Sequence, residues 1–379
     1  MITLDAVSKR YGSREVAVAE LSLTVADGEL CILIGPSGCG KTTTLRMINR
    51  LIEPTGGRIL IDDQNVLTMN PVTLRRGIGY VIQQGGLFPH RRIFDNVATV
   101  PRLLGWDKER VHKRVVELLE LVGLDPGDYG RRFPHELSGG ERQRVGVARA
   151  LGADPPVLLM DEPFAAVDPV TRQRLQNQFL DLQAELKKTI VFVTHDLEEA
   201  AKLGDRIAVL SKGGVLEQYD TPEEILGHPA TDFVADFVGS DRGVRRLAVV
   251  YIGVDDLDHP PVVGPDSTMA EARASAGADR GSDGAGNDSR WAVVVGPDGV
   301  LRGWVPLDPG LDGDVVDRLT RFAVEVPLGS SMRTALAEML QRDVSWIPVA
   351  EHGRYLGVLT PDGLHAAMRR SVGGQAVES

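Results

Sequence analysis

Cysteine is nearly absent from this sequence, with two copies among 379 residues, Cys31 and Cys39. Their spacing is not that of a metal-binding pair, so we interpret both as small packing residues rather than as zinc ligands or disulfide partners. Long apolar runs are absent too: no stretch approaches the roughly 20 residues that span a bilayer, and the N-terminus lacks the apolar segment of a signal peptide. We therefore expect a cytosolic chain that reaches any membrane through a partner.

Acidic residues outnumber basic ones, 53 to 42. The net charge is −11, and residues 241–379 contain 20 Asp and Glu against 14 Arg and no Lys, a net of −6. Binding to nucleic acid through counterion release requires clustered Lys and Arg. We therefore expect no nucleic-acid partner. The length exceeds that of one ordinary core and predicts two or three domains.

Residues 1–240 alternate short β-rich runs with amphipathic stretches, the pattern of a mostly parallel α/β sheet. The strand candidates are "LCILIG", "PVLLMDE", "TIVFVTHD" and "RIAVL". Between about 85 and 150 the strand signal disappears, and "KERVHKRVVELLELVGL" has helical spacing. We expect a helical subdomain there, inserted in the α/β domain.

The C-terminal stretch, residues 245–372, has a different character. "STMAEARA" followed by "WAVVVGPDGVLRGWV" resembles "SSMRTALAEML" followed by "WIPVAEHGRYLGVLT", with Gly299 and Gly303 at the offsets of Gly353 and Gly357. This predicts a smaller α+β domain made of a duplicated unit, a helix followed by two strands. The polar, glycine-rich "AGADRGSDGAGNDS" in the first copy is interpreted as a flexible loop.

"GPSGCGKTT" matches the phosphate-loop pattern, in which glycines let backbone N–H groups close around phosphates at a helix N-terminus. It predicts ATP with Mg²⁺ as the cofactors: Lys41 would reach the β and γ phosphates, and the Thr42 hydroxyl would ligate the metal. The nucleotide-binding candidates are Gly35, Pro36, Ser37, Gly38, Cys39, Gly40, Lys41, Thr42 and Thr43.

Polar residues also follow two apolar strands. Asp161 is a candidate Mg²⁺ ligand, and Glu162 beside it a candidate general base for the attacking water. His195 is a candidate γ-phosphate sensor, and the amide of Gln83 in "YVIQQGGLFPH" a candidate contact to Mg²⁺ and water. Strand-end acids in solvent are the alternative for the carboxylates, and a solvated turn residue is the alternative for His195.

A second glycine-rich helix start, "LSGGERQR", occurs about a hundred residues after the first. By itself it is explained as a capping box, with Ser138 as N-cap and Glu141 at the third helical position. The other motifs of the chain indicate a further role for this turn. A phosphate loop, a glutamine loop, LSGGE, a strand-end Asp-Glu, "AAVD" and a strand-end His occur in that order along the sequence. In this order residues 1–240 resemble the ATP-binding cassette ATPases.

That resemblance implies a homodimer facing head to tail, with ATP between one subunit's phosphate loop and the other's LSGGE turn. Ser138, Gly139 and Gly140 would then contact the opposite nucleotide, and Asp168 would lie in the loop that crosses the dimer. Tyr11 would stack on adenine, although an early aromatic residue can equally pack. A non-transport cassette ATPase, of DNA repair or ribosomes, is the rival class; its usual coiled coil, zinc cysteines or second cassette do not occur here.

"YVIQQGGLFPH", "RRFPHELSGG", "QYDTPEEIL" and "DFVADFVGSDRGVRRL" resemble the ATPase subunits of osmoprotectant importers, for glycine betaine, proline, choline and related quaternary amines. The likeness implies a peripheral protein at the cytoplasmic face of the inner membrane, an integral-membrane permease and an extracytoplasmic substrate-binding protein. Another cargo, such as an amino acid, a sulfonate or a metal complex, is the alternative.

The duplicated C-terminal stretch resembles a tandem pair of CBS domains, but the ribose-binding pattern is degraded. Thr360 is followed by Asp362 one position early, and Pro306 stands at the corresponding place in the first copy. A cyclic dinucleotide, with Arg333, Arg354, Arg369 and Arg370 as candidate anion contacts, is therefore favoured over a mononucleotide. A dimerising scaffold that binds no ligand is the alternative.

Overall fold

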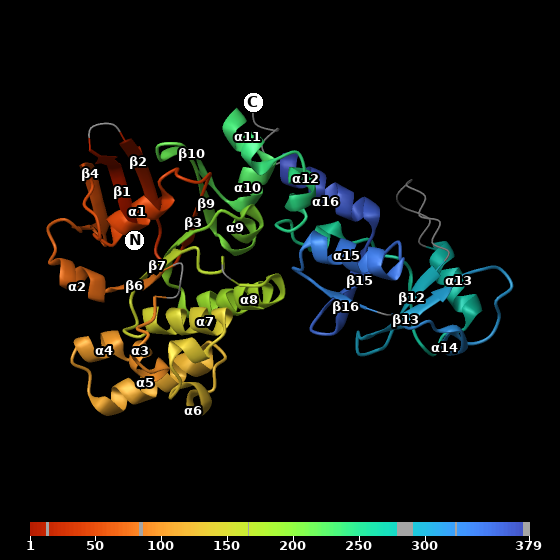
Figure 1. Cartoon of the computed structure of the whole chain (residues 1–379). Coiled ribbons are helices and arrows are strands. Elements are labelled where there is room, and N and C mark those ends of the chain that lie inside the picture. The colour runs from red at the N-terminus through yellow and green to blue at the C-terminus, as the bar shows by residue number, and fades with distance from the viewer. Residues whose placement is uncertain (13–14, 83–85, 166, 279–290, 323, 374–379) are drawn as a thin grey trace. The chain divides into compact units, whose positions relative to one another are not determined.

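The computed structural model describes residues 1–12, 15–82, 86–165, 167–278, 291–322 and 324–373, and it divides into two compact units, 1–240 and 241–379 (Figure 1). Among the described residues, a large apolar cluster lies in the first unit, and two smaller clusters lie in the second. No helix within the described ranges is long and apolar enough to cross a membrane.

A six-stranded sheet forms the centre of unit 1, in the order β10-β9-β3-β8-β7-β6. All neighbours pair in parallel except β10 and β9. The strands are β3 (Leu30–Ile34), β6 (Ile78–Val81), β7 (Val157–Asp161), β8 (Thr189–Val193), β9 (Arg206–Ser211) and β10 (Val215–Asp220). The four strands predicted from the sequence are confirmed as β3, β7, β8 and β9, and every residue of β3, β7 and β8 is buried.

A second, antiparallel sheet of unit 1 was not predicted. It has the order β2-β1-β4-β5, with β1 (Ile2–Tyr11), β2 (Glu15–Val25), β4 (Gly56–Ile61) and β5 (Gln64–Asn65). The interval between β1 and β2 is too short for the helix that a parallel crossover requires, so these strands pair as a hairpin. The predicted mostly parallel sheet is therefore confirmed for the central sheet of unit 1 and not for this second sheet.

Helices occupy the chain between β6 and β7 as expected. They are α3 (Ile93–Val97), α4 (Thr99–Leu103), α5 (Lys108–Leu121), α6 (Pro126–Tyr129), the 3₁₀ turn Pro134–Glu136 and α7 (Gly139–Ala150). Helix α5 begins where the Asp107 carboxylate accepts a hydrogen bond from the Arg110 N–H, 2.8 Å away. The other helices of unit 1 are α1 (Lys41–Ile48), α2 (Pro71–Arg76), α8 (Pro169–Leu186), α9 (Leu197–Leu203), α10 (Pro222–Gly227) and α11 (Asp232–Val238).

Unit 2 contains one supersecondary pattern twice, in two three-stranded sheets. The first copy is β11 (Val262–Val263), α13 (Met269–Ala278), β12 (Trp291–Val295) and β13 (Leu301–Pro306); the second is β14 (Val326–Pro327), α15 (Met332–Arg342), β15 (Ile347–Glu351) and β16 (Arg354–Leu359). In each copy the first pair of strands is parallel and the second antiparallel. Unit 2 also contains α12 (Arg242–Arg246), the 3₁₀ turn Val254–Asp256, α14 (Val315–Arg318) and α16 (Pro361–Gly373). The first three residues of the predicted flexible loop, 276–278, belong to α13, and the rest lies outside the described residues.

The two copies exchange backbone pairings. Asp258, which precedes the first copy, bridges Val358 in the last strand of the second, with N···O distances of 2.8 and 2.9 Å. Thr320, which precedes the second copy, bridges Trp304 in the last strand of the first, at 2.9 Å in both directions. Each copy therefore completes the sheet of the other.

Close backbone packing explains the glycine in the last strand of each copy. A Cβ atom on Gly303 would lie 2.3 Å from the carbonyl oxygen of Thr320, and one on Gly357 would lie 2.8 Å from the Cβ of Leu257. Both contacts are shorter than van der Waals packing allows. The crossing segment thus requires glycine at this position.

Replacing Gly303 with Ala should destabilise unit 2 by about 1–3 kcal/mol, the usual range for overpacking against atoms that cannot move away. Three of the four tryptophans lie in unit 2, so in a Trp106→Phe background tryptophan fluorescence during urea unfolding reports on that unit. Gly243→Ala is the matched control, because its Cβ would meet open space in α12. A loss in Gly303→Ala no larger than in the control would contradict the packing argument.

Candidate nucleotide site

The phosphate-loop residues lie between the buried strand β3 and helix α1. The Lys41 ammonium is buried and donates to the carbonyl oxygens of Gly35 at 2.7 Å and Pro36 at 3.0 Å. The Lys41 side chain therefore binds backbone carbonyls of the phosphate loop itself. Helix α1 begins after Gly40, whose φ of 104° and lack of a side chain leave the first turn uncapped by any side-chain hydrogen bond. A helix start of this kind offers N–H groups to an anion.

Two of the loop glycines are required sterically. A Cβ on Gly35 would lie 2.1 Å from the carbonyl oxygen of Leu210, and one on Gly40 would lie 2.5 Å from that of Ala17. Gly38 differs, because a Cβ there meets nothing within 4 Å although its φ of 77° is left-handed. The first two glycines pack the loop against strands β9 and β2, and the third sets its turn.

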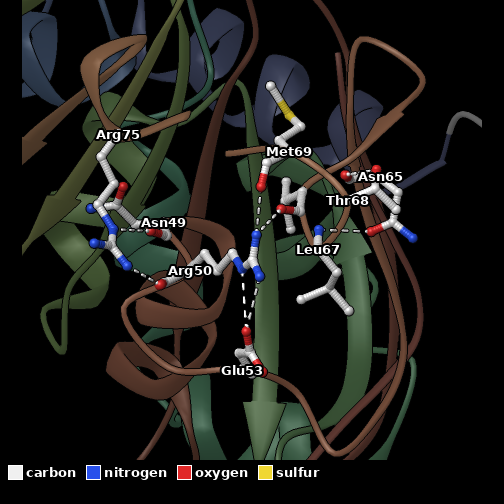
Figure 2. A network of polar contacts seen from close by, with 9 residues as sticks. Asn49, Arg50, Glu53, Asn65, Leu67, Thr68, Met69 and Arg75 are labelled. Atoms are coloured by element: carbon white, nitrogen blue, oxygen red, sulfur yellow. Dashed lines mark hydrogen bonds and ion pairs between the residues drawn. The ribbon is translucent and has the colours of Figure 1, made fainter. Parts of the chain in front are cut away.

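Helix α1 is also held at its other end (Figure 2). Arg75 of α2 donates to the carbonyl oxygens of Asn49 at 3.3 Å and Arg50 at 2.5 Å, just after the helix ends. The Arg50 guanidinium in turn donates to the carbonyl oxygen of Met69 at 2.7 Å. Cations at these carbonyls complement the helix dipole. The helix that carries Lys41 is thus fixed at both ends.

Asp161 and Thr42 meet at the edge of the sheet. Asp161 is the last residue of β7, it is buried, and its Oδ1 accepts a hydrogen bond from Thr42 Oγ1 at 3.0 Å. Burial raises the pKa of the Asp161 carboxyl above its usual value, the Thr42 hydrogen bond opposes this, and the neighbouring Glu162 charge adds to it. A hydroxyl and a carboxylate oxygen side by side are the hard oxygen donors that Mg²⁺ prefers.

Glu162 follows on a strained backbone. Its φ is 45°, in the left-handed region that glutamate rarely adopts, and its N–H donates to the carbonyl oxygen of Val193 at 3.0 Å. Its Oε1 lies 3.2 Å from Nδ1 of His195, whose side chain is 64 % exposed against 21 % for Glu162. His195 is held in the short segment between β8 and α9, where Asp196 caps α9 by accepting from the N–H groups of Glu198 and Glu199. The structure thus brings the predicted base and the predicted histidine together.

The LSGGE turn has the geometry of the capping box. Ser138 Oγ accepts from the Glu141 N–H at 3.3 Å, and Glu141 Oε2 accepts from the Ser138 N–H at 2.7 Å. The hydroxyl of Tyr129 donates to Glu141 Oε1 at 2.6 Å, and this bond, followed by the Ser138 N–H bond, lowers the pKa of Glu141 to about 2. Ser138 and Gly139 are exposed and Gly140 is half-buried, so the turn presents its helix start to solvent.

The remaining predicted residues lie in different surroundings. Tyr11 ends β1 with 43 % of its surface exposed, and the Lys9 ammonium lies 5.2 Å from its ring centroid. Asp168 is the N-cap of α8, accepting from the Thr171 N–H at 3.0 Å, which lowers the pKa of its carboxyl. Gln83 lies outside the described residues. Tyr11 and Asp168 are thus accessible, and the N-cap accounts for Asp168 structurally.

Sequence reasoning missed several supporting residues. Tyr129 was not singled out, although its hydroxyl makes the shortest of the hydrogen bonds to Glu141 described above. A buried pair was also missed: Gln176 of α8 donates to Glu199 of α9 at 3.0 Å, and burial raises the pKa of the Glu199 carboxyl. Phe164, Thr194 and Glu199 line a small cavity together with Glu162 and His195. A contact between separate helices leaves no spacing signal in the sequence, so these partners appear only in the fold.

A phosphate loop after a buried parallel strand, with an acid pair and a histidine at the ends of the neighbouring strands, defines a P-loop ATPase. The comparisons with known proteins narrow this class. A family model described as ABC transporter matches residues 18–165. Two solved structures of the ABC transporter cassette MJ0796, one described as a dimer and one as a dimeric post-hydrolysis state bound to ADP and Pi, are 35% identical with a TM-score of 0.53; they cover 59% of this chain and 99% of theirs.

Full-length relatives extend the likeness through unit 2. The osmoprotectant import ATP-binding protein OsmV of Salmonella typhimurium is 46% identical, over 96% of this chain and 94% of its own. The choline transport ATP-binding protein OpuBA and the glycine betaine/carnitine/choline transport ATP-binding protein OpuCA of Bacillus subtilis are 43% and 44% identical, over 99% of this chain and 98% of each of theirs. The chain belongs to the ABC transporter family, among the ATP-binding subunits of osmoprotectant importers, and it is an ATPase.

Glu162→Gln keeps the shape of the side chain but removes its basicity, so turnover should fall by roughly 10²- to 10⁴-fold, the usual scale for a positioned general base. ATP binding should survive, because the phosphate loop is unchanged, and ATP should then trap a closed dimer. Steady-state ATPase rates and gel filtration with ATP measure the two effects. Near-normal turnover in this variant would show that Glu162 is not the general base.

Proposed function

We propose that this chain powers the import of a quaternary amine, of the glycine betaine, proline or choline type, through a partner permease. The observation that carries the proposal is the presence of two glycine-rich helix starts in one chain, one packed around Lys41 and one exposed at Ser138. The names of the full-length relatives, all import or transport ATP-binding proteins, support the cargo class.

The phosphate-loop site fits ATP with Mg²⁺. Lys41 would exchange its two carbonyl contacts for the β and γ phosphates, and Thr42, Asp161 and Gln83 would hold the metal, which neutralises charge on the phosphates when bound. Glu162 would accept a proton from the attacking water. His195, 3.2 Å from that carboxylate, would donate a hydrogen bond to the γ-phosphate and keep Glu162 oriented. Tyr11 would stack on the adenine.

The exposed LSGGE turn would serve the nucleotide of a second copy of the chain. The hydrogen bonds of Ser138 and Glu141 described above stay within residues 129–141, and the turn faces solvent. In a head-to-tail homodimer, Ser138, Gly139 and Gly140 would contact the partner's γ-phosphate, and Asp168 would lie in the loop that crosses between subunits. The dimeric cassettes among the solved structures support this assembly.

The partners follow from the import role. An integral-membrane permease would hold the dimer at the cytoplasmic face of the inner membrane as a peripheral subunit. An extracytoplasmic binding protein would deliver the cargo to that permease. The acidic balance of the chain gives no support to a nucleic-acid partner.

Unit 2 would act as a CBS-like regulatory domain. Two of its residues are less available than the sequence indicated: Thr360 Oγ1 donates to Asp258 at 2.6 Å and accepts from the Gly363 N–H, and Arg370 is paired with the buried carboxylate of Asp256. A ribose contact by Thr360 would disrupt its cap. A cyclic dinucleotide bound across two copies therefore remains the proposed ligand, through Arg354 and Arg369, which are exposed.

Complementation between two inactive chains tests the shared site. Lys41→Ala removes the phosphate lysine, and Ser138→Arg blocks the turn. A mixed dimer should contain one intact site, formed by the turn of the first chain and the phosphate loop of the second. The amount of ATP held between the two chains of mixed dimers should therefore be about half that of wild-type dimers, and each variant alone should hold none across the interface. Mixed dimers that form without recovering ATP binding would refute the head-to-tail arrangement.

Uptake of labelled choline or glycine betaine by cells with the intact importer tests the cargo. Glu162→Gln should lower uptake by the roughly 10²- to 10⁴-fold expected for its ATPase rate, because import and hydrolysis are coupled. Glu185→Gln is the matched control: the same change is made at an exposed acid near the end of α8, just before β8 begins and therefore away from the edge where that strand ends. Uptake that persists in Glu162→Gln would show that ATP hydrolysis by this chain does not power the import of quaternary amines.

A further inference from the structure

Four aromatic residues of unit 2 gather outside both of its apolar cores. Trp291 opens β12 and Trp346 directly precedes β15, so the two copies place a tryptophan at the same point of the repeat. Their rings stack at a centroid distance of 3.8 Å with 1° between the planes. Trp304 and Phe322 stand nearly perpendicular to Trp346, at 83° and 80°. All four are half-buried, and none belongs to the two core clusters.

Three of these aromatic residues line one cavity of about 400 Å³: Trp304, Phe322 and Trp346. This volume lies within the range of small-molecule sites. The walls are fixed before any ligand enters: Trp304 is paired through its backbone with Thr320, two residues before Phe322, and Trp346 rests on Trp291. We name this cavity, with its three rings, the aromatic corner.

Charges at the rim of the aromatic corner nearly balance. Arg342 lines it but is paired with Glu338 at 2.9 Å. Arg321 and Asp343 also line it, both are exposed, and neither has an ion-pair partner in the described part of the chain. The Asp343 carboxylate is therefore available to a positive group of a ligand, and the Arg321 guanidinium is available to a carboxylate if the ligand has one.

We propose that the aromatic corner binds the trimethylammonium group of a small quaternary amine, so that unit 2 senses the cargo after import. A quaternary cation has no N–H to donate and loses little on leaving water for ring faces, which attract it through their quadrupoles. Asp343 adds an opposite charge, and Arg321 would meet the carboxylate of a betaine. The ligand class rests on the proposed function, whereas the site rests on the ring geometry alone.

Binding of choline to the purified full chain tests the proposal without permease or ATP. Tryptophan fluorescence in a Trp106→Phe background, checked by calorimetry, should show saturable binding. The neutral isostere, in which carbon replaces the choline nitrogen, should bind at least about tenfold more weakly, because it lacks the cation–π attraction. Equal binding of the isostere would show an ordinary apolar cavity and overturn the proposal.

Phe322→Leu keeps apolar volume but removes one ring, and should weaken choline binding about three- to thirtyfold. Tyr251→Leu removes an exposed aromatic residue outside the corner and should leave binding unchanged. Asp343→Asn, at an exposed position, gives a second variant if Phe322→Leu fails to fold; it should weaken binding of choline. Unchanged binding in the folded variants would refute the site.

Two further outcomes overturn the proposal. The first is absence of binding at roughly 100 mM choline. Three rings, each contributing a cation–π energy at the low end of its usual range, would already give half-saturation at that concentration. Displacement of choline by adenosine would assign the corner to a stacked base instead. Neither outcome touches the ATPase or uptake experiments, so the import proposal and this site can fail separately.

Discussion

Leu33, Val193 and Asp161 stand in one row across the neighbouring strands β3, β8 and β7, and parallel backbone pairing holds that register. The strands are buried along their whole length, so a slip by one residue would exchange the side chains that pack on the two faces and disrupt the core. The chain leaves all three strands at the same edge. The phosphate loop, the acid pair and the histidine therefore converge on one place, although 160 residues separate Gly35 from His195 in the sequence.

The second glycine-rich helix start, at Ser138, lies in a different part of the chain and is held by different contacts. The first loop is closed by glycines that touch backbone and by a lysine that binds its own carbonyls. The second is held by a reciprocal pair of side chains, Ser138 and Glu141, and by the Tyr129 hydroxyl. The low pKa of Glu141 keeps this carboxylate ionised, and so able to accept both bonds, at any pH near neutrality. These hydrogen bonds hold the turn although it is exposed, which suits the proposed contact with a second subunit.

The sequence predicted the central strands, the helical insertion and the duplicated unit, because buried parallel strands, amphipathic spacing and repeated glycines are local signals. The antiparallel sheet was missed because β1 and β2 follow one another without a helix, which the alternation pattern had not weighed. Contacts between distant helices, such as Gln176 with Glu199, leave no trace in spacing. The capping role of Thr360 and the pairing of Arg370 with Asp256 were likewise invisible in the sequence. Three of the four tryptophans fall in unit 2, a signal that was available and went unused.

The left-handed backbone of Glu162 and its proposed role as general base favour different residues at this position. Glycine would adopt this conformation without strain, and asparagine with little, yet neither could take a proton from water. Random substitution followed by selection for thermal stability alone should therefore drive this position away from glutamate, whereas selection for growth on the imported solute should restore it. The residue at position 162 would therefore show whether a population had been selected for stability or for import, because the more stable chain and the active chain carry different residues there.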